Sequence, residues 1–303
     1  MPSARPDPAT LSAFAVSILL GGGNAVAVSF SNRELAPFWG ATLRFAAAAW
    51  VFLLLAFALR RPLPRGRALT GAVVYGVLGF ALSYALAYYA LTRIPPGLAQ
   101  TLLALVPLFA VLLAAAHGQE RLTTRAILGA LLALAGIAIV FRGQLALEVA
   151  VAPLLAIVLG AACIAETAVA VKAFPKADPV ATNAVAMSVG AALLLALSLV
   201  AREPWTVPGL RATWSALAWL VLVGSVVVFW LYLFVLGRWT ASATSYQFVL
   251  LPFVTLAISA WLTGERLTTS VAVGGALVLA GVWIGALSKR TRAPQAVPEG
   301  TSD

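Results

Sequence analysis

Long apolar segments follow one another along the whole chain, separated by short polar connections. Each apolar segment has about 18 or more residues, enough for a helix to cross the ~30 Å hydrocarbon core of a bilayer. We therefore predict ten membrane-spanning helices, at Leu11–Ser29, Pro37–Leu59, Leu69–Leu91, Pro95–Ala116, Thr123–Phe141, Val149–Val171, Pro179–Val200, Thr213–Leu236, Ala241–Leu262 and Thr269–Leu287. The connections leave almost no chain for a soluble catalytic domain.

The composition agrees with this pattern. Hydrophobic residues make up 62% of the 303 residues and charged residues 10%, against about 45–50% and about 25% in a soluble globular domain. The predicted fold class is an all-α integral membrane protein. The single cysteine, Cys163, falls within a predicted span, so the chain has no intrachain disulfide.

One stretch of the sequence occurs twice. A shift of 145 positions places residues 91–139 on residues 236–284 without a gap. It superimposes the residues Glu-Arg-Leu-Thr-Thr at 120–124 on the same five residue types at 265–269. An offset shared by two apolar segments and their connecting turn is much stronger support for duplication than a single short motif.

The two copies are predicted to have opposite orientations. Each half contains five predicted spans, and this odd number makes the second copy enter the membrane in the opposite direction. We expect a first five-helix repeat at residues 1–146, a second, inverted one at 147–288, and a polar cytoplasmic tail at 289–303. Inverted repeats are related by a pseudo-two-fold axis in the membrane plane, with the binding site near the midplane between them. The pattern predicts alternating access.

Basic residues are distributed unevenly between the two sides. With the N-terminus inside, the cytoplasmic segments hold 13 Lys and Arg residues and the opposite segments six. This imbalance follows the positive-inside rule and places both termini in the cytoplasm. The net charge of +10 thus reports topology. We expect no nucleic-acid partner, because no polybasic domain stands outside the membrane.

Two polar residues in the first two spans are candidates for substrate contact. Asn24 follows three glycines, and Arg44 lies seven residues into the second span. A helical rise of 1.5 Å per residue places both at a similar depth, toward the outer surface. Arginine is costly there, which leaves three interpretations of Arg44. It is a structural anchor to carbonyls or Asn24, a contact for the substrate carboxylate, or a side chain that snorkels to the surface.

Aromatic residues form a stripe in the third span. Phe80, Tyr84 and Tyr88 are spaced i, i+4 and i+8, which places them on one helix face. The repeat shift aligns Tyr84 with Phe229, and Trp230 is adjacent to Phe229. Two aromatic sets related by the pseudo-axis would line opposite ends of one central path. The alternative is a pair of aromatic belts at the membrane interfaces.

Paired prolines mark the fourth and ninth spans. Pro107 and Pro252 coincide under the repeat shift, and each removes a helix hydrogen bond and kinks its helix. Paired kinks in inverted copies favour a pair of hinges over two static bends. Gln100 in the fourth span and Tyr246 in the ninth add polar groups to these helices, so we include both among the candidate substrate-binding residues.

Glu166 in the sixth span is the one acidic residue well inside a predicted span. A titratable group within the membrane is a functional hypothesis by default. Glu166 could carry a coupling proton, meet a substrate ammonium group, or pair with Lys172. The sole histidine, His117, has no cysteine or second histidine near it in the sequence, which argues against a metal site.

Conventional enzyme chemistry has no support in the sequence. Paired catalytic groups are missing, and so is a phosphate-binding glycine loop with its lysine. We therefore expect no cofactor, no metal and no enzymatic activity.

The proline helices, each followed by a Glu-Arg-Leu turn, and the small-residue helices that end each half complete the pattern. With ten spans in two inverted fives, the chain resembles the EamA branch of the drug/metabolite transporter superfamily over residues 11–287. The resemblance implies a secondary carrier that exports amino acids or other metabolites. Within that branch, Tyr84, Phe229, Trp230 and Tyr246 look most similar to the bacterial YddG-type aromatic amino-acid exporters.

We therefore expect export of small metabolites, with aromatic or other apolar amino acids first, and with Asn24 and Gln100 orienting the zwitterion. The alternative is a multidrug exporter of lipophilic cations coupled to protons through Glu166. The expected partners are a small-molecule substrate and the lipid bilayer, with the protein acting as a monomer. Arginine outnumbers lysine 17 to 3, which suggests a GC-rich bacterial source and hence the inner membrane.

Overall fold

The computed structural model describes residues 7–119, 122–145, 150–175, 177–238, 246–264 and 268–287. In these ranges the chain forms helices and connecting turns, without a β-strand. Parts of the repeated Glu-Arg-Leu turn, at 120–121 and 265–267, lie outside the described residues, as does the predicted tail at 289–303.

The helices follow one another in two series. The first series is α1 (Pro8–Ser31), α2 (Pro37–Ala58), α3 (Arg67–Val74), the π-helical segment η1 (Tyr75–Leu82), α4 (Ser83–Ala90), α5 (Pro96–Leu103), α6 (Val106–Ala116) and α7 (Thr124–Leu145). The second series is α8 (Val151–Ala170), the 3₁₀ turn η2 (Val171–Ala173), α9 (Pro179–Val200), α10 (Arg211–Ala218), the π-helical segment η3 (Trp219–Val227), α11 (Val228–Arg238), α13 (Tyr246–Thr263), α14 (Thr269–Val282) and the π-helical segment η4 (Trp283–Leu287).

Aspartate-proline pairs start two of the spans. Asp7 precedes α1 and accepts a hydrogen bond from the backbone N–H of Thr10 at 2.6 Å. Asp178 precedes α9 and accepts from the N–H groups of Val180 and Ala181 at 3.0 and 3.2 Å. Such side chains satisfy helix N–H groups that lack a partner within the helix, and proline fits the first turn because its missing N–H is not needed there.

The membrane-spanning architecture is confirmed. Among the described residues, eight helical spans are long and apolar enough to cross a bilayer by length and composition, and the shorter apolar helices Gln247–Thr263 and Thr269–Gly285 bring the number to the predicted ten. In two spans the helix continues through a π-helical segment: η1 joins α3 to α4, and η3 joins α10 to α11. The protein is an all-α membrane protein with two inverted five-helix repeats.

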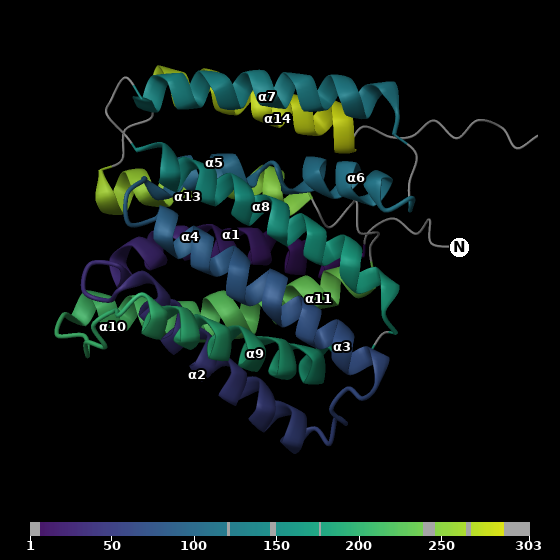
Figure 1. Cartoon of the computed structure of the whole chain (residues 1–303), viewed down its shortest axis with the longest axis vertical. Helices are drawn as coiled ribbons and strands as arrows, with labels where there is room; N and C mark the ends of the chain where they lie inside the picture. The colour runs from purple at the N-terminus through teal and green to yellow at the C-terminus, as the bar shows by residue number, and fades with distance from the viewer. Residues whose placement is uncertain are drawn as a thin grey trace, which may run out of the picture.

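Equivalent helices of the two repeats pack against each other at both ends of the molecule. Figure 1 shows α7 beside α14 at one end of the long axis and α2 beside α9 at the other, and both pairs are in contact. Between these pairs, α1 packs against α13 and α11, while its counterpart α8 packs against α4 and α6. Each repeat therefore completes its packing with helices of the other, as expected for a pseudo-two-fold axis in the membrane plane.

Backbone details recur between the repeats as well. Pro37 and Pro179, which begin α2 and α9, are 142 positions apart. The same separation relates Arg60 and Arg202, which follow these helices and have positive φ angles of 51° and 53°. Positive φ is uncommon outside glycine, so two such turns in register mark equivalent helix ends.

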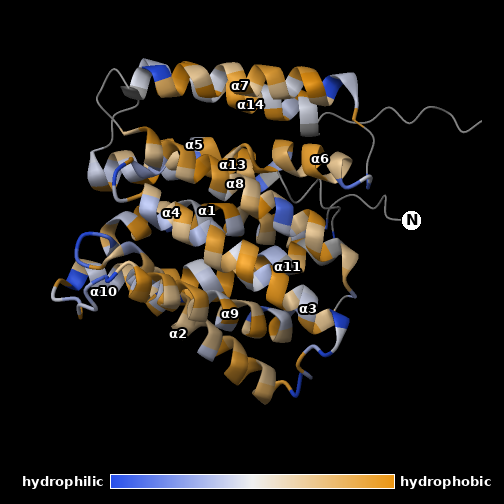
Figure 2. Ribbon diagram, in the orientation of Figure 1, coloured by the Kyte–Doolittle hydropathy of each residue, from blue (hydrophilic) through white to orange (hydrophobic). Residues whose placement is uncertain are grey.

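Apolar side chains cover the outside of the bundle. Figure 2 shows hydrophobic residues along the helices and the more hydrophilic ones mainly at the helix ends and in the connecting turns. Phe57 on α2 is 84% exposed and Leu131 on α7 is 58% exposed. In a soluble protein such a surface would promote aggregation, but in a bilayer it faces lipid.

Glycines allow α7 and α14 to touch through their backbones. Gly129 faces Gly281, and Gly136 faces Gly274, in a crosswise pattern. A Cβ atom added at Gly136 would lie 2.6 Å from the Gly274 carbonyl oxygen, and one added at Gly281 would lie 2.5 Å from the Gly129 carbonyl oxygen. Small residues permit this close approach between membrane helices.

The two faces of the bundle are held by different contacts. On the face where α1 ends, the Glu203 carboxylate accepts from the N–H groups of Phe38 and Trp39 at 3.1 and 2.8 Å, and Trp39 stacks on Trp205. On the face where α1 begins, Arg61 Nε lies 3.6 Å from Asp178 Oδ2. The two side chains of this ion pair are 55% and 22% exposed, so the pair contributes little.

Glu34 adds a second carboxylate to the face where α1 ends. It accepts from the N–H groups of Gly209 and Leu210 and from the Thr213 hydroxyl. The Thr213 hydrogen bond, opposed by desolvation and aided by the two N–H groups, holds the pKa of Glu34 below its ordinary value of 4.5. The carboxylate form is therefore favoured in the folded protein.

This linkage predicts an acid-sensitive contact at Glu34. Because the folded-state pKa is depressed, its stabilisation is present above about pH 4.5 and is lost as pH falls through the lower, folded-state pKa. We expect Glu34→Gln to lower the melting temperature in detergent at pH 6 and to matter progressively less toward pH 3. A difference between wild type and variant that stays constant across this range would contradict the assignment.

Candidate functional site

Rings from both repeats meet in one aromatic cluster at the centre of the bundle. We define it as Phe45, Tyr75, Phe80, Tyr84 and Phe229. Phe80 lies in the middle, with ring centroids 5.2 Å from Phe45, 4.8 Å from Tyr75, 6.2 Å from Tyr84 and 5.3 Å from Phe229. The two aromatic sets expected at opposite ends of a path are thus joined through Phe80, which is fully buried.

Three other predicted site residues lie elsewhere or are not described. Trp230 is 57% exposed and contacts Phe234 at a centroid distance of 6.0 Å. Neighbouring helix positions point about 100° apart, so Trp230 faces outward while Phe229 joins the aromatic cluster. Gln100 is buried on α5, and no contact in the described part of the chain joins it to this cluster. The side chain of Tyr246 lies outside the described residues.

Arg44 is fully buried beside the aromatic cluster. Its Nε donates to Ser225 Oγ at 3.0 Å and its Nη2 donates to the Gly224 carbonyl oxygen at 3.2 Å. Its guanidinium carbon lies 4.9 Å from the centroid of the Phe45 ring and 5.1 Å from that of Tyr84. The side chain is 0% exposed, which excludes snorkelling and agrees with an anchor to backbone carbonyls.

Asn24 shares the carbonyl group that Arg44 uses. Its Nδ2 donates to the Gly224 oxygen at 3.4 Å. A Cβ atom at Gly224 would clash with the Asn24 side chain as it is placed, so a larger residue there would displace the Asn24 amide. The helix α1 is continuous through Gly21, Gly22 and Gly23, so these glycines do not break the helix.

Gly224 and Ser225 belong to a π-helical segment that occurs in both repeats. The repeat shift places η1, residues 75–82, on residues 220–227, which lie within η3. Ser225 Oγ donates to the Leu220 carbonyl oxygen at 2.8 Å, five residues earlier. π-Helical turns are rare and are frequent at functional sites. Their recurrence at equivalent positions makes this region the leading candidate for substrate handling.

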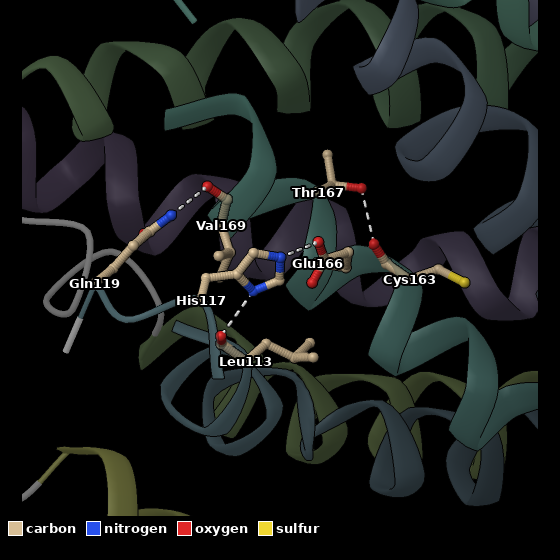
Figure 3. A network of polar contacts seen from close by, with 7 residues as sticks. All are labelled: Leu113, His117, Gln119, Cys163, Glu166, Thr167 and Val169. Atoms are coloured by element: carbon tan, nitrogen blue, oxygen red, sulfur yellow. Dashed lines mark hydrogen bonds and ion pairs between the residues drawn. The ribbon is translucent and has the colours of Figure 1, made fainter. Parts of the chain in front are cut away.

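Glu166 pairs with the sole histidine. Figure 3 shows the Glu166 carboxylate facing the His117 ring, with Oε1 and Nε2 3.3 Å apart. His117 Nδ1 contacts the Leu113 carbonyl oxygen at 2.9 Å, which makes Nδ1 the donor and fixes the ring orientation. Oε2 of Glu166 is buried and has no hydrogen-bond partner among the described residues. The expected alternative partner, Lys172, has a side chain outside the described part of the chain.

The His117–Glu166 pair joins two spans at the face where α1 begins. His117 follows α6 directly, and Glu166 lies on α8, one turn after Cys163 and next to Thr167. Nearby, Gln119 Nε2 donates to the Val169 carbonyl oxygen at 3.4 Å (Figure 3). No group of three or more metal-ligating side chains occurs among the described residues.

The paired prolines have different local structures. The span of Pro107 is interrupted, because α5 ends at Leu103 and α6 begins at Val106. Pro252 lies inside the continuous helix α13. Proline lacks the N–H that would bond to the fourth residue before it, so a break just before Pro107 has a direct cause. Whether the two prolines act as hinges stays a prediction.

Sequence reasoning did not find the roles of Ser225 and His117. Ser225 contributes through a π-helical turn, which has no recognised sequence signal. A signal for His117 did exist, because the only histidine and the only acid deep in a span are both placed toward the same face by the topology. Their proximity depends on the packing of α6 against α8.

Comparisons with known proteins agree with this architecture. The profile of the EamA-like transporter family matches residues 8–142 and 151–286. An uncharacterized transporter of Archaeoglobus fulgidus is 24% identical over 273 residues, covering 89% of this chain and 96% of the relative. One solved crystal structure of a protein has a TM-score of 0.64 at 21% identity, covering 92% of this chain and 97% of the other, a similarity of fold.

Proposed function

The chain belongs to the EamA-like transporter family, and we propose that it is a secondary carrier that exports small metabolites, principally aromatic or other apolar amino acids. One observation carries the substrate class: the aromatic cluster contains rings from both repeats, with Phe80 and Phe229 5.3 Å apart. Small-molecule sites are lined mainly by apolar and aromatic side chains with a few placed polar groups. Arg44 supplies such a group beside these rings, and Asn24 shares its Gly224 carbonyl acceptor.

The inverted repeat supports alternating access. Each repeat packs against the equivalent helices of the other. An outward-open state and the inward-open state related to it by the pseudo-two-fold axis would therefore be closely similar arrangements of the same helices. The break before Pro107, and Pro252 inside α13, would supply two points at which spans bend during this exchange. The protein acts as a monomer in the bacterial inner membrane, with the face where α1 begins in the cytoplasm.

The alternative substrate class is a lipophilic cation, exported in exchange for protons through Glu166. The pairing with His117 bears on this alternative, because it gives the Glu166 carboxylate a partner within the protein. To serve as the counter-charge of a cationic drug, Glu166 would first have to leave His117. The His117–Glu166 contact therefore favours the amino-acid substrates.

Replacing Glu166 with glutamine separates the two candidates. We expect Glu166→Gln to keep at least half of the amino-acid export, since the amide can still bond to His117 while the aromatic cluster is unchanged. Initial rates in proteoliposomes measure this. The opposite result has two parts: the wild type exports a lipophilic cation but no amino acid, and Glu166→Gln loses that cation export completely. This result would establish the cation exporter.

The test of the proposed function is uptake into proteoliposomes that contain the purified full-length protein. Labelled aromatic, aliphatic and charged amino acids and a lipophilic cation are compared, with and without a pH gradient. Saturable movement of aromatic amino acids is the expected result, and its dependence on the gradient shows whether protons are coupled. Movement of the cation alone, or of none of these compounds, would refute the proposal.

A further inference from the structure

Arg44 is a buried positive charge without a carboxylate partner in the described part of the chain. Each described carboxylate is engaged elsewhere: Asp7 and Asp178 cap helices, Glu34 and Glu203 bind backbone N–H groups, and Glu166 faces His117. A fully enclosed, unpaired guanidinium is costly in protein or membrane surroundings. Two hydrogen bonds, to Ser225 and Gly224, do not neutralise the charge.

Two buried donor groups at this charge have no hydrogen-bond acceptor among the described residues. Arg44 Nη1 is buried and makes no hydrogen bond within the described residues, and the same holds for the hydroxyl of Tyr88. Tyr88 is fully buried, and its hydroxyl oxygen lies next to the Arg44 guanidinium, whose charge and N–H groups act on it. Buried polar groups in native proteins are nearly always satisfied, so two adjacent unsatisfied donors beside a positive charge point to an anionic ligand.

Trp219 adds another donor without an acceptor to this region of the bundle. The buried indole N–H of Trp219 has no acceptor among the described residues. This ring lies against α1 at Gly23, next to Asn24. Trp219 and Tyr88 come from η3 and α4, in equivalent spans of the two repeats. Each repeat therefore holds a buried donor without an acceptor among the described residues, Tyr88 near Arg44 and Trp219 near Gly23.

The surroundings select an organic anion over an inorganic one. The Arg44 guanidinium stacks near the rings of Phe45 and Tyr84, and these rings belong to the aromatic cluster. A carboxylate attached to an apolar body could place its oxygens at Nη1 and the Tyr88 hydroxyl and its body against the rings. Arginine suits such binding because its planar group presents paired donors to a carboxylate.

We propose that Arg44 and Tyr88 bind the carboxylate group of the transported substrate. This inference rests on the proposed function for the identity of the substrate, but the carboxylate requirement has its own test. Both side chains are enclosed, so the carboxylate reaches them in a conformation in which α2 and η3 have separated. Arg44 then serves as an anchor to Gly224 in the closed state and as a receptor in the open one.

Three compounds with one phenyl ring separate the effect of the carboxylate from that of the ammonium group. L-Phenylalanine carries both groups, 3-phenylpropionate carries only the carboxylate, and phenethylamine carries only the ammonium group. Ligand-dependent melting shifts are measured for the full-length wild type, for Arg44→Gln and for Arg93→Gln, an exposed arginine as the matched control. We expect wild type and Arg93→Gln to bind both carboxylates at least tenfold tighter than phenethylamine. Arg44→Gln should lose at least tenfold for the carboxylates and little for phenethylamine.

Other outcomes overturn the inference. They are unchanged relative affinities in Arg44→Gln, a preference of the wild type for phenethylamine, stabilisation by chloride alone, or no binding by any carboxylate. Tyr88→Phe, which removes only the hydroxyl, should weaken carboxylate binding several-fold. If Arg44→Gln does not fold, Arg44→Lys is used in its place, because it keeps the charge without the planar guanidinium. We expect Arg44→Lys to bind the carboxylates more weakly than the wild type does.

Uptake of L-phenylalanine separates this inference from the proposed function. Carboxylate binding that depends on Arg44, without transport of any amino acid, would keep the receptor and refute the amino-acid exporter. Transport of L-phenylalanine that is equal in wild type and Arg44→Gln would keep the exporter and refute the receptor.

Discussion

Alanine in place of Gly136 is expected to destabilise the protein by about 3 kcal/mol, the upper end of the usual cost of overpacking. The added Cβ would lie 2.6 Å from the Gly274 carbonyl oxygen and 2.8 Å from the Val278 backbone nitrogen. Backbone atoms cannot rotate away as a flexible side chain can, so α7 and α14 must separate. Separation would remove the contact along both helices at one end of the bundle. Thermal unfolding in detergent, with retention on a size-exclusion column, measures the effect.

A second glycine provides the matched control. Gly160 on α8 is also a helical glycine in the membrane region, but a Cβ there would lie 3.4 Å from the Ser83 carbonyl oxygen, an ordinary contact distance. Gly160→Ala should change the stability by less than about 0.5 kcal/mol, because alanine favours the helix and meets no obstacle. Gly274→Ala should match Gly136→Ala, since the two glycines face each other. Equal melting temperatures for Gly136→Ala and Gly160→Ala would show that the helices are not in backbone contact.

Phe80→Ala is expected to cost about 3–5 kcal/mol and to abolish transport of aromatic amino acids. Removal of a buried phenylalanine loses apolar burial and leaves a cavity, which together give this magnitude. Phe80 has no exposed surface and contacts four rings. Tyr75 lies in η1 with Phe80, and the other three rings come from α2, α4 and α11. Its loss would disconnect Phe229 of the second repeat from the rings of the first.

Two controls separate packing from transport in this experiment. Trp230→Ala removes a larger ring that is 57% exposed, and should leave both stability and uptake nearly unchanged. Phe80→Leu keeps most of the volume, so it should recover much of the stability while uptake of aromatic amino acids stays impaired. Equal losses from Phe80→Ala and Trp230→Ala, or full uptake by Phe80→Leu, would contradict the role assigned to the aromatic cluster.

The spans and the inverted repeat were predictable because their signals are local or repeated. Apolar length alone indicates a crossing helix, and the gap-free match between residues 91–139 and 236–284 indicates duplication. Helical rise also placed Asn24 and Arg44 at a similar depth, and the structure joins them through the Gly224 carbonyl group. Depth is a one-dimensional quantity, so sequence position determines it well.

Rotation about the helix axis and long-range packing were less predictable. Phe229 and Trp230 are adjacent in sequence, yet one joins the aromatic cluster and the other is exposed. The partner of Glu166 depends on the approach of α6 to α8, which brings His117 within 3.3 Å. π-Helical turns also shift the facing of every later residue in a span, and η1 and η3 lie upstream of most of the candidate aromatic positions.

Arg44 shows what fusion of the two copies makes possible. Its equivalent in the second repeat, 142 positions further on as for Pro37 and Pro179, is Ala186. A pair of identical half-length chains in opposite orientations would contain every residue twice, and each charge would therefore come with its twin. A fused chain can carry an odd number. Gene duplication and fusion thus allow one copy to carry a charge that the other copy lacks, so that a symmetric scaffold can hold an asymmetric molecule.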